Sequence, residues 1–287
     1  MQAGPQERNV TYTNLHLHLT PHSIPAPTAV VDYACDAAKL LSADLAVSTS
    51  RLRFVPPANW LTGALVVEVA ANFEEAAERE TSALISRLEK RGLASGVRVE
   101  ISTDDWAWPS AGANSSWRGR LSDLCILNLS PDEASGWSTA VDWLFGSGRP
   151  CLLYPDKSSQ AFSLSKILVC WDYSRAATRA VADALPMLHN AGSVHIVTID
   201  DDKDTLPDAG GNGLAAYLAG HGVKATPQSV LLRGRTTGSA ILDHAKAIGA
   251  DLIVVGAFGH SRMSEFIMGG ATQDLLQHSD IPLLMSH

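Results

Sequence analysis

The chain has 287 residues and a formal net charge of −8, with 46% hydrophobic and 18% charged residues. This composition is typical of one or two globular domains and excludes intrinsic disorder. The acidic balance argues against binding to nucleic acid or to anionic membranes, because both need a basic surface. No run approaches the roughly 18 apolar residues of a spanning helix, and residues 1–10 lack the apolar core of a secretory signal. We therefore expect a cytoplasmic protein.

The four cysteines are scattered along the chain and form no C-x-x-C motif: Cys35, Cys125, Cys151 and Cys170. We interpret them as reduced, mostly buried thiols rather than as disulfides or metal ligands.

In the first half, segments with strand and helix periodicity alternate. Strands are predicted at residues 15–19, 43–49, 97–102, 123–129 and 150–154. Helices are predicted at residues 28–41, 60–91 and 137–145, with a tryptophan-rich connection over 106–117 and a short helix after it. This alternation predicts a parallel sheet with helices on both faces.

The polar segment 155–165 interrupts the pattern, so we place a domain boundary there, between domains of residues 1–157 and 158–287. The alternation then starts again. Strands are predicted at residues 166–172, 193–199, 228–232, 252–255 and 282–285, and helices at 176–189, 213–220, 237–248 and from about 271. We expect Gly249 to close the third of these helices.

Two series of five strands in one chain predict an internal duplication. The two copies align Asn14 with Lys166, Asp123 with Asp251, and Pro150 with Pro282. The predicted fold is α/β, with two tandem doubly wound domains, each a five-stranded parallel sheet flanked by helices.

A glycine-bearing loop distinguishes the second copy. Gly256 ends a buried strand, two residues separate it from Gly259, and nine residues separate Gly259 from Gly269 and Gly270 at the start of a helix. Ligands of open α/β sheets bind where strands end, and a glycine there permits close backbone approach and positive φ. Free amides at a helix N-terminus favour an anion. The alternative is that these glycines only end and start elements, and spacing alone leaves both interpretations open.

Residues 166–287 resemble the universal stress protein family, and the whole chain is similar to a tandem member with an adenine nucleotide alpha hydrolase-like fold. Three matches carry the resemblance: Ile167-Leu-Val-Cys-Trp-Asp172-Tyr-Ser174, Gly249-Ala-Asp-Leu-Ile-Val-Val-Gly256, and the G-x-x-G-x9-G spacing. In the first half the resemblance rests on element order and on the repeat.

The resemblance implies a site for ATP or another adenine nucleotide, with or without Mg²⁺. It assigns Asp172 to the adenosine, and the backbone around Thr198 and Ile199 to the base pocket. The phosphates would be held by the loop and the helix start, which comprise Gly256, Gly259, His260, Gly269, Gly270 and Thr272. His260 would place a cation near phosphate; the alternative is a solvated loop histidine.

Gly270 departs from the family pattern, which has serine or threonine after the last glycine. A phosphate-facing hydroxyl is thereby lost, at a cost of ~1–2 kcal/mol, or roughly tenfold in affinity. The backbone amides remain, so weakened binding is expected.

The first half lacks both signatures. The alignment puts Thr20 opposite Asp172, and residues 128–135 contain no glycine. We therefore expect this half to be structural or partner-binding. The family resemblance also implies that strands 150–154 and 282–285 pair, which would make the two halves a pseudo-dimer, and that the chain forms a homodimer as an alternative.

Other candidate sites are weaker. His16, His18 and His22 suggest either a metal site or buried histidines with hydrogen-bond partners, and the second is favoured because both faces of a parallel strand are covered. The tryptophans of the first half suggest a pocket or interface, or core packing, which is favoured: Trp60, Trp106, Trp108, Trp117, Trp137 and Trp143.

No catalytic residue is predicted, because the chain has no G-x-S-x-G elbow, Walker motif or dinucleotide fingerprint. Three functions remain: a stress-response regulatory protein that binds an adenine nucleotide, an interaction module with an empty site, and a weak ATP hydrolase.

Overall fold

The computed structural model describes residues 11–19, 28–54, 64–108, 115–130, 134–200, 211–257 and 270–287. The first half contains β1 (Asn14–Leu19), α1 (Thr28–Leu41), β2 (Asp44–Phe54), α2 (Ala64–Ser95), β3 (Val99–Trp108), the 3₁₀ helix η2 (Ser115–Leu121), β4 (Leu124–Leu129), α3 (Ala134–Gly146) and β5 (Cys151–Pro155). The second half contains β6 (Lys166–Cys170), α4 (Arg175–His189), β7 (Ser193–Asp200), α5 (Asn212–Gly220), β8 (Ala225–Leu231), α6 (Thr237–Ile248), β9 (Leu252–Gly256), α7 (Gly270–His278) and β10 (Leu283–Ser286).

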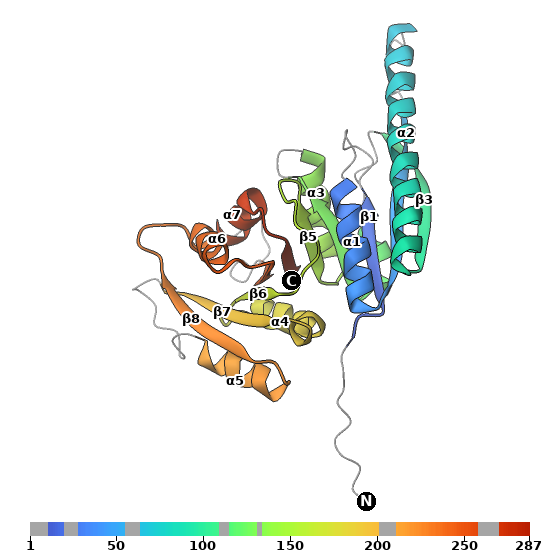
Figure 1. Ribbon diagram of the computed structural model, residues 1–287. Helices are drawn as coiled ribbons and strands as arrows, with labels where there is room; N and C mark the ends of the chain where they lie inside the picture. Colours follow the sequence, from blue (N-terminus) through green and yellow to red (C-terminus); the bar gives the residue numbers. More distant parts are fainter. Residues whose placement is uncertain are drawn as a thin grey trace, which may run out of the picture.

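The strands form one ten-stranded sheet in the order β3-β2-β1-β4-β5-β10-β9-β6-β7-β8 (Figure 1). All neighbouring strands are parallel except β5 and β10, which pair antiparallel with Leu153 opposite Leu283. The predicted α/β fold with a mainly parallel sheet is confirmed. The pairing expected between the last strands of the two halves is present, and it joins the two sets of five strands.

Apolar side chains cover both faces of this sheet. One layer holds residues of α1, α2, α4 and α5, and the other holds residues of α3, α6 and α7. Both layers cross the β5–β10 junction, as the hydrogen bond from the Tyr12 hydroxyl to the Asp183 carbonyl of α4 also does. The two halves therefore share their hydrophobic core.

Three strands differ from the sequence prediction. β2 and β3 run on until Phe54 lies opposite Trp108, so the connection predicted to begin at residue 106 is wrong for its first three residues. β8 begins at Ala225 and includes Pro227, a residue that favours a loop in sequence. Proline is tolerated there because β8 is an edge strand of the sheet.

Two local predictions are confirmed, for the end of α6 and for the cysteines. Gly249 ends α6 in the left-handed region, at φ 67°, and its amide bonds the Lys246 carbonyl at 3.1 Å. All four cysteines are buried free thiols. The boundary predicted within residues 155–165 falls between β5 and β6, where the Tyr154 hydroxyl donates to the Ser158 carbonyl at 3.0 Å. No helix in the described ranges is both long and apolar enough to cross a membrane.

Candidate functional site

Four of the predicted site residues lie along one edge of the second half of the sheet. Strands β7, β6 and β9 are neighbours and run parallel, so their carboxyl ends meet at this edge. Asp172 follows β6, Thr198 and Ile199 lie near the end of β7, and Gly256 ends β9. The fold therefore brings together the adenosine and phosphate ends of the predicted site.

The turn after β6 fixes Asp172. Its Oδ1 accepts the Ser174 amide at 2.9 Å, and the Ser174 hydroxyl accepts the Ala177 amide at 3.0 Å, which caps the N-terminus of α4. Tyr173, between the two, adopts the left-handed region at φ 61°. The exposed Asp172 carboxylate is thus held at the rim of the edge by the residues that begin α4.

Thr198 and Ile199 contribute mainly backbone atoms to the candidate site. Thr198 is 2% exposed, and its backbone lies in register with Ser229 of β8. Ile199 is half-buried and packs against the core layer of α6 and α7. Both residues lie near the carboxyl end of β7, and that their main chain lines a base pocket stays a prediction.

Two aromatic residues beside Asp172 carry a signal that sequence reasoning missed. The rings of Trp171 and Tyr173 lie 5.1 Å apart, and Tyr173 is 37% exposed. The Trp171 indole nitrogen is buried and has no hydrogen-bond partner in the described part of the chain. Buried polar groups are usually paired, so this N–H is an unused donor within the described part of the chain. The pattern Trp-Asp-Tyr after a buried strand could have identified these residues.

Gly256 is required for a different reason from the one predicted. A Cβ atom there would lie 2.3 Å from the Ala177 nitrogen and 2.4 Å from the Ala176 carbonyl carbon. Its φ is not in the positive range, so the expectation of positive φ is wrong. The missing side chain lets the first turn of α4 lie against the end of β9. A helix N-terminus, with its partial positive charge, consequently reaches this edge.

The rest of the glycine loop is described only in part. Gly259, His260 and Gly269 lie outside the described residues. Gly270 is the first residue of α7 and is exposed, and no atom of the described residues lies within 4 Å of the position where a Cβ would project. Thr272, predicted to supply a hydroxyl donor, lies in the first turn of α7 and is 6% exposed.

A model of the universal stress protein family matches residues 164–287. Residues 164–287 belong to the universal stress protein family. A solved universal stress protein from Archaeoglobus fulgidus matches the fold with a TM-score of 0.66 and 17% identity, covering 94% of this chain and 97% of its own. A functionally unknown protein from Pseudomonas aeruginosa matches with a TM-score of 0.59 and 12% identity, covering 96% and 92%. These two likenesses show that the fold extends over both halves. Among curated proteins, no match was found.

The position equivalent to Gly256 of the universal stress protein domain is closed in the first half. Asn128 occupies it, and its Nδ2 donates to the Ser130 hydroxyl at 2.8 Å and to Asp156 Oδ1 at 2.5 Å. Thr20, the counterpart of Asp172, lies outside the described residues. Polar side chains thus fill the end of β4, where β9 has a bare backbone.

The predictions for the histidines and tryptophans of the first half are confirmed for some of these residues only. His16 and His18 are buried and share Ser48 as a partner, which confirms the interpretation as hydrogen-bonded core residues. His22 lies outside the described residues. Trp143 is 1% exposed, as expected for core packing, whereas Trp117 is 56% exposed. Trp60 is outside the described residues, as are the side chains of Trp106, Trp108 and Trp137. In the described ranges, no group of three or more His, Cys, Asp or Glu is placed to hold a metal ion.

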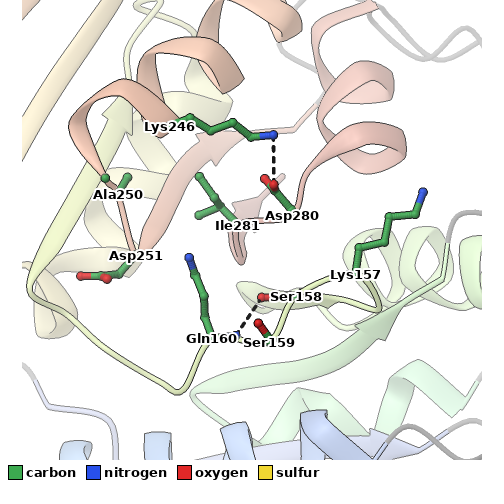
Figure 2. Close-up of a pocket in the computed structure, with 10 residues that line it drawn as sticks. Lys157, Ser158, Ser159, Gln160, Lys246, Ala250, Asp251, Asp280 and Ile281 are labelled. Carbon is green, nitrogen blue, oxygen red and sulfur yellow. Dashed lines mark hydrogen bonds and ion pairs between the residues drawn. The ribbon is translucent and has the colours of Figure 1, made fainter.

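A separate cavity of about 350 Å³ opens at the amino ends of β9 and β10, the opposite edge from Gly256 (Figure 2). The linker residues Ser158 to Gln160 form one wall, and Lys246 and Asp280, with Nζ and Oδ2 3.0 Å apart, form the other. No predicted site residue lines it. This cavity is distinct from the candidate site of the universal stress protein domain.

Proposed function

We propose that the universal stress protein domain binds ATP or a related adenine nucleotide at the carboxyl edge of its sheet, within a stress-response regulatory protein. Asp172 receives the adenosine, and the backbone of Thr198 and Ile199 lines the base. The phosphates lie along the glycine loop, between Gly256 and the start of α7. The carrying observation is that one edge holds Asp172, the end of β7 and Gly256 beside the capped N-terminus of α4.

The chemistry of this edge supports the proposal. The Asp172 carboxylate is an acceptor suited to ribose hydroxyls. The Trp171 and Tyr173 rings, which flank it in sequence, offer planar apolar surface, and the indole N–H has no partner among the described residues. The N-termini of α4 and α7 favour the negative phosphates. Gly259, His260 and Gly269 keep their proposed phosphate roles from the family resemblance.

Mg²⁺ enters this proposal only with the nucleotide. The described residues supply no cluster of three or more metal-ligating side chains. Oxygen ligands from phosphates and water are sufficient for Mg²⁺, which usually keeps several waters. The ion would therefore be carried by the phosphates and would add no protein ligand from the described ranges.

The second candidate is an interaction module whose site stays empty, and Gly270 favours it. The first residue of α7 lacks the hydroxyl of the family's ATP motif. Exposed apolar residues on η2, Trp117 and Leu121 at 56% and 90%, support a partner-binding first half in either case. The third candidate is a weak ATP hydrolase.

The proposed binding partners also differ between the two halves of the chain. The two halves of the chain already pair through β5 and β10, so a homodimer would have to use other surfaces than this one. We propose that the protein acts in the cytoplasm, because its four buried free thiols suit a reducing compartment.

Calorimetry tests nucleotide binding directly. Titration with Mg-ATP should give saturable heat that Asp172→Ala reduces at least ~tenfold, by loss of hydrogen bonds to a charged group. Gly259→Val should have a similar effect, and Glu78→Ala, an exposed acid on α2, should bind like the wild type. Unchanged affinity in Asp172→Ala would place the nucleotide elsewhere. ATP turnover that is lost in Asp172→Ala and Gly259→Val would instead favour the hydrolase.

A further inference from the structure

A buried polar network lies in the core of the first half, away from the nucleotide edge. His16 and His18 project from β1 on the same side, and both contact one hydroxyl of β2. The His16 Nε2 atom lies 2.8 Å from Ser48 Oγ, and the His18 Nδ1 atom lies 2.9 Å from it. The three residues are 5%, 3% and 1% exposed.

The network continues into the two elements that cover this part of the sheet. Ser115 Oγ of η2 lies 3.4 Å from His18 Nε2, and it accepts the Trp143 indole N–H of α3 at 3.2 Å. The Trp143 ring stacks on His18 at a centroid distance of 4.7 Å, and lies 5.2 Å from His16. The histidine pair therefore ties both η2 and α3 to the sheet.

The hydrogen bonds limit how many protons this arrangement holds. The Ser48 hydroxyl carries one proton and can donate to only one of the two rings. One consistent sequence of donations runs from Trp143 to Ser115, His18, Ser48 and finally His16. In that sequence both imidazoles are neutral. If both rings were protonated, both would donate to Ser48, and its own proton would lose its acceptor.

Burial and one nearby cation disfavour protonation of His16. From η2, the Arg118 guanidinium faces the network, where its Nη1 donates to Ser102 of β3 at 3.3 Å. From β4, the uncharged Cys125 and Leu127 lie in register with His16 and His18. From α3, Trp143 is neutral, and partial burial raises the pKa of its neighbour Asp142. Burial first, and Arg118 second, lower the pKa of His16 from 6.5 to about 4.

We propose that the His16–Ser48–His18 network is an acid-sensitive latch, which holds η2 and α3 on the sheet at neutral pH and releases them in mild acid. Because the pKa of His16 is lowered by folding, the opened state binds more protons between pH 6.5 and about 4. The closed state therefore loses stability as the pH falls through this window. The opening equilibrium should shift about 30-fold between pH 7.5 and pH 5 on account of His16 alone. Opening would expose Trp143 and Leu144, which are 1% and 3% exposed in the closed form.

Amide hydrogen exchange of the full chain, corrected for intrinsic rates, measures this opening. The latch predicts that amides of η2 and α3 lose protection about 30-fold more than those of α1, a helix without histidine, between pH 7.5 and pH 5. In His16→Gln, which cannot be protonated, this ratio should fall at least ~tenfold, and the exposed His278→Gln should match the wild type. The proposal would be overturned if the relative loss of protection in the wild type were below about threefold, or if His16→Gln kept the relative loss of about 30-fold.

A second measurement needs no variant. Proton NMR of the wild-type histidine rings should show His16 still neutral at pH 5 in the closed form. Titration of His16 near pH 6.5 with η2 and α3 still protected would also overturn the latch. Neither readout involves nucleotide, so these experiments test the latch independently of the proposed nucleotide site.

Discussion

Asp123 and Asp251 make the same hydrogen bond in the two halves of the chain, each to the backbone amide that begins a neighbouring strand. Asp123 Oδ2 accepts the backbone amide of Asn14, the first residue of β1, at 3.0 Å, and Asp251 Oδ2 accepts that of Lys166, the first residue of β6, at 2.7 Å. Each aspartate thereby fixes the start of the strand that neighbours its own. The alignment of Asn14 with Lys166 and of Asp123 with Asp251, made from sequence, thus corresponds to one repeated contact.

We expect Asp123→Ala and Asp251→Ala each to lower the free energy of unfolding by about 1–2 kcal/mol, because each leaves strand-start amides without their carboxylate. Chemical denaturation measures the effect, and Glu78→Ala on the surface of α2 should stay within about 0.5 kcal/mol of the wild type. Backbone bonds from Thr13 and Asn14 hold the pKa of Asp123 below 3.8 despite the opposing effect of burial. Its contribution is therefore present above pH 3.8 and lost as the pH falls below that value. A wild-type stability that does not fall there would argue against this role.

Phe145 and His287 form a contact between the halves. Their rings meet edge to face, with centroids 4.6 Å apart, and His287 Nδ1 lies 3.4 Å from the carbonyl of Ala257, which follows Gly256. We expect Phe145→Ala to destabilise the protein by about 1 kcal/mol, the usual value of an aromatic pair. The double variant with His287→Ala should add little to either single variant, since both remove the same contact. Fully additive effects would mean that the two rings do not interact energetically.

Gly256 offers a steric test. Gly256→Ala would drive a methyl group into the backbone of Ala176 and Ala177, so we expect a loss of about 1–3 kcal/mol. Gly220→Ala is the matched control, because nothing lies within 4 Å of the Cβ position there and its φ is not positive. That control should be neutral or up to about 1 kcal/mol stabilising at the end of α5. Equal stability of the two variants would contradict the close packing of α4 on β9.

Gly270 tests the phosphate assignment. A side chain there meets open space, so Gly270→Ser should fold like the wild type. If α7 begins at the phosphates, the restored hydroxyl should tighten Mg-ATP binding roughly tenfold, while adenosine binding stays constant. Gly270→Ala controls for helix propensity. If Gly270→Ser and Gly270→Ala raised the Mg-ATP affinity equally, or if Gly270→Ser also raised the adenosine affinity, the phosphates would not lie at this position.

The order of elements was predictable because both periodicity and turn residues repeat along the chain. Gly249 at the end of α6 is an example, since its left-handed conformation follows from local chemistry alone. Features that depend on distant partners were not predictable. The clash that requires glycine at 256 comes from α4, and the partner of His16 is 32 residues away. Proline in β8 is acceptable because no further strand of the described ranges pairs with that edge.

Asp172, Thr198, Ile199 and Gly256 could be placed at one edge from sequence, because strands that run parallel end together. The burial of the Thr272 side chain could not be predicted from sequence, since it depends on how α7 packs on the domain. Trp171 and Tyr173 stood in the matched motif, but only the structure sets their rings 5.1 Å apart beside the carboxylate.

The central claim is that the second half binds an adenine nucleotide, and small-molecule analysis of the purified full chain tests it most directly. The protein would be isolated without added ligand and denatured, and the released compounds identified by mass spectrometry, with calorimetry in millimolar Mg-ATP on the same preparation. We predict released adenine nucleotide, or saturable heat with Mg-ATP that Asp172→Ala abolishes. No released nucleotide together with no heat would contradict the claim and leave the interaction module as the function of this fold.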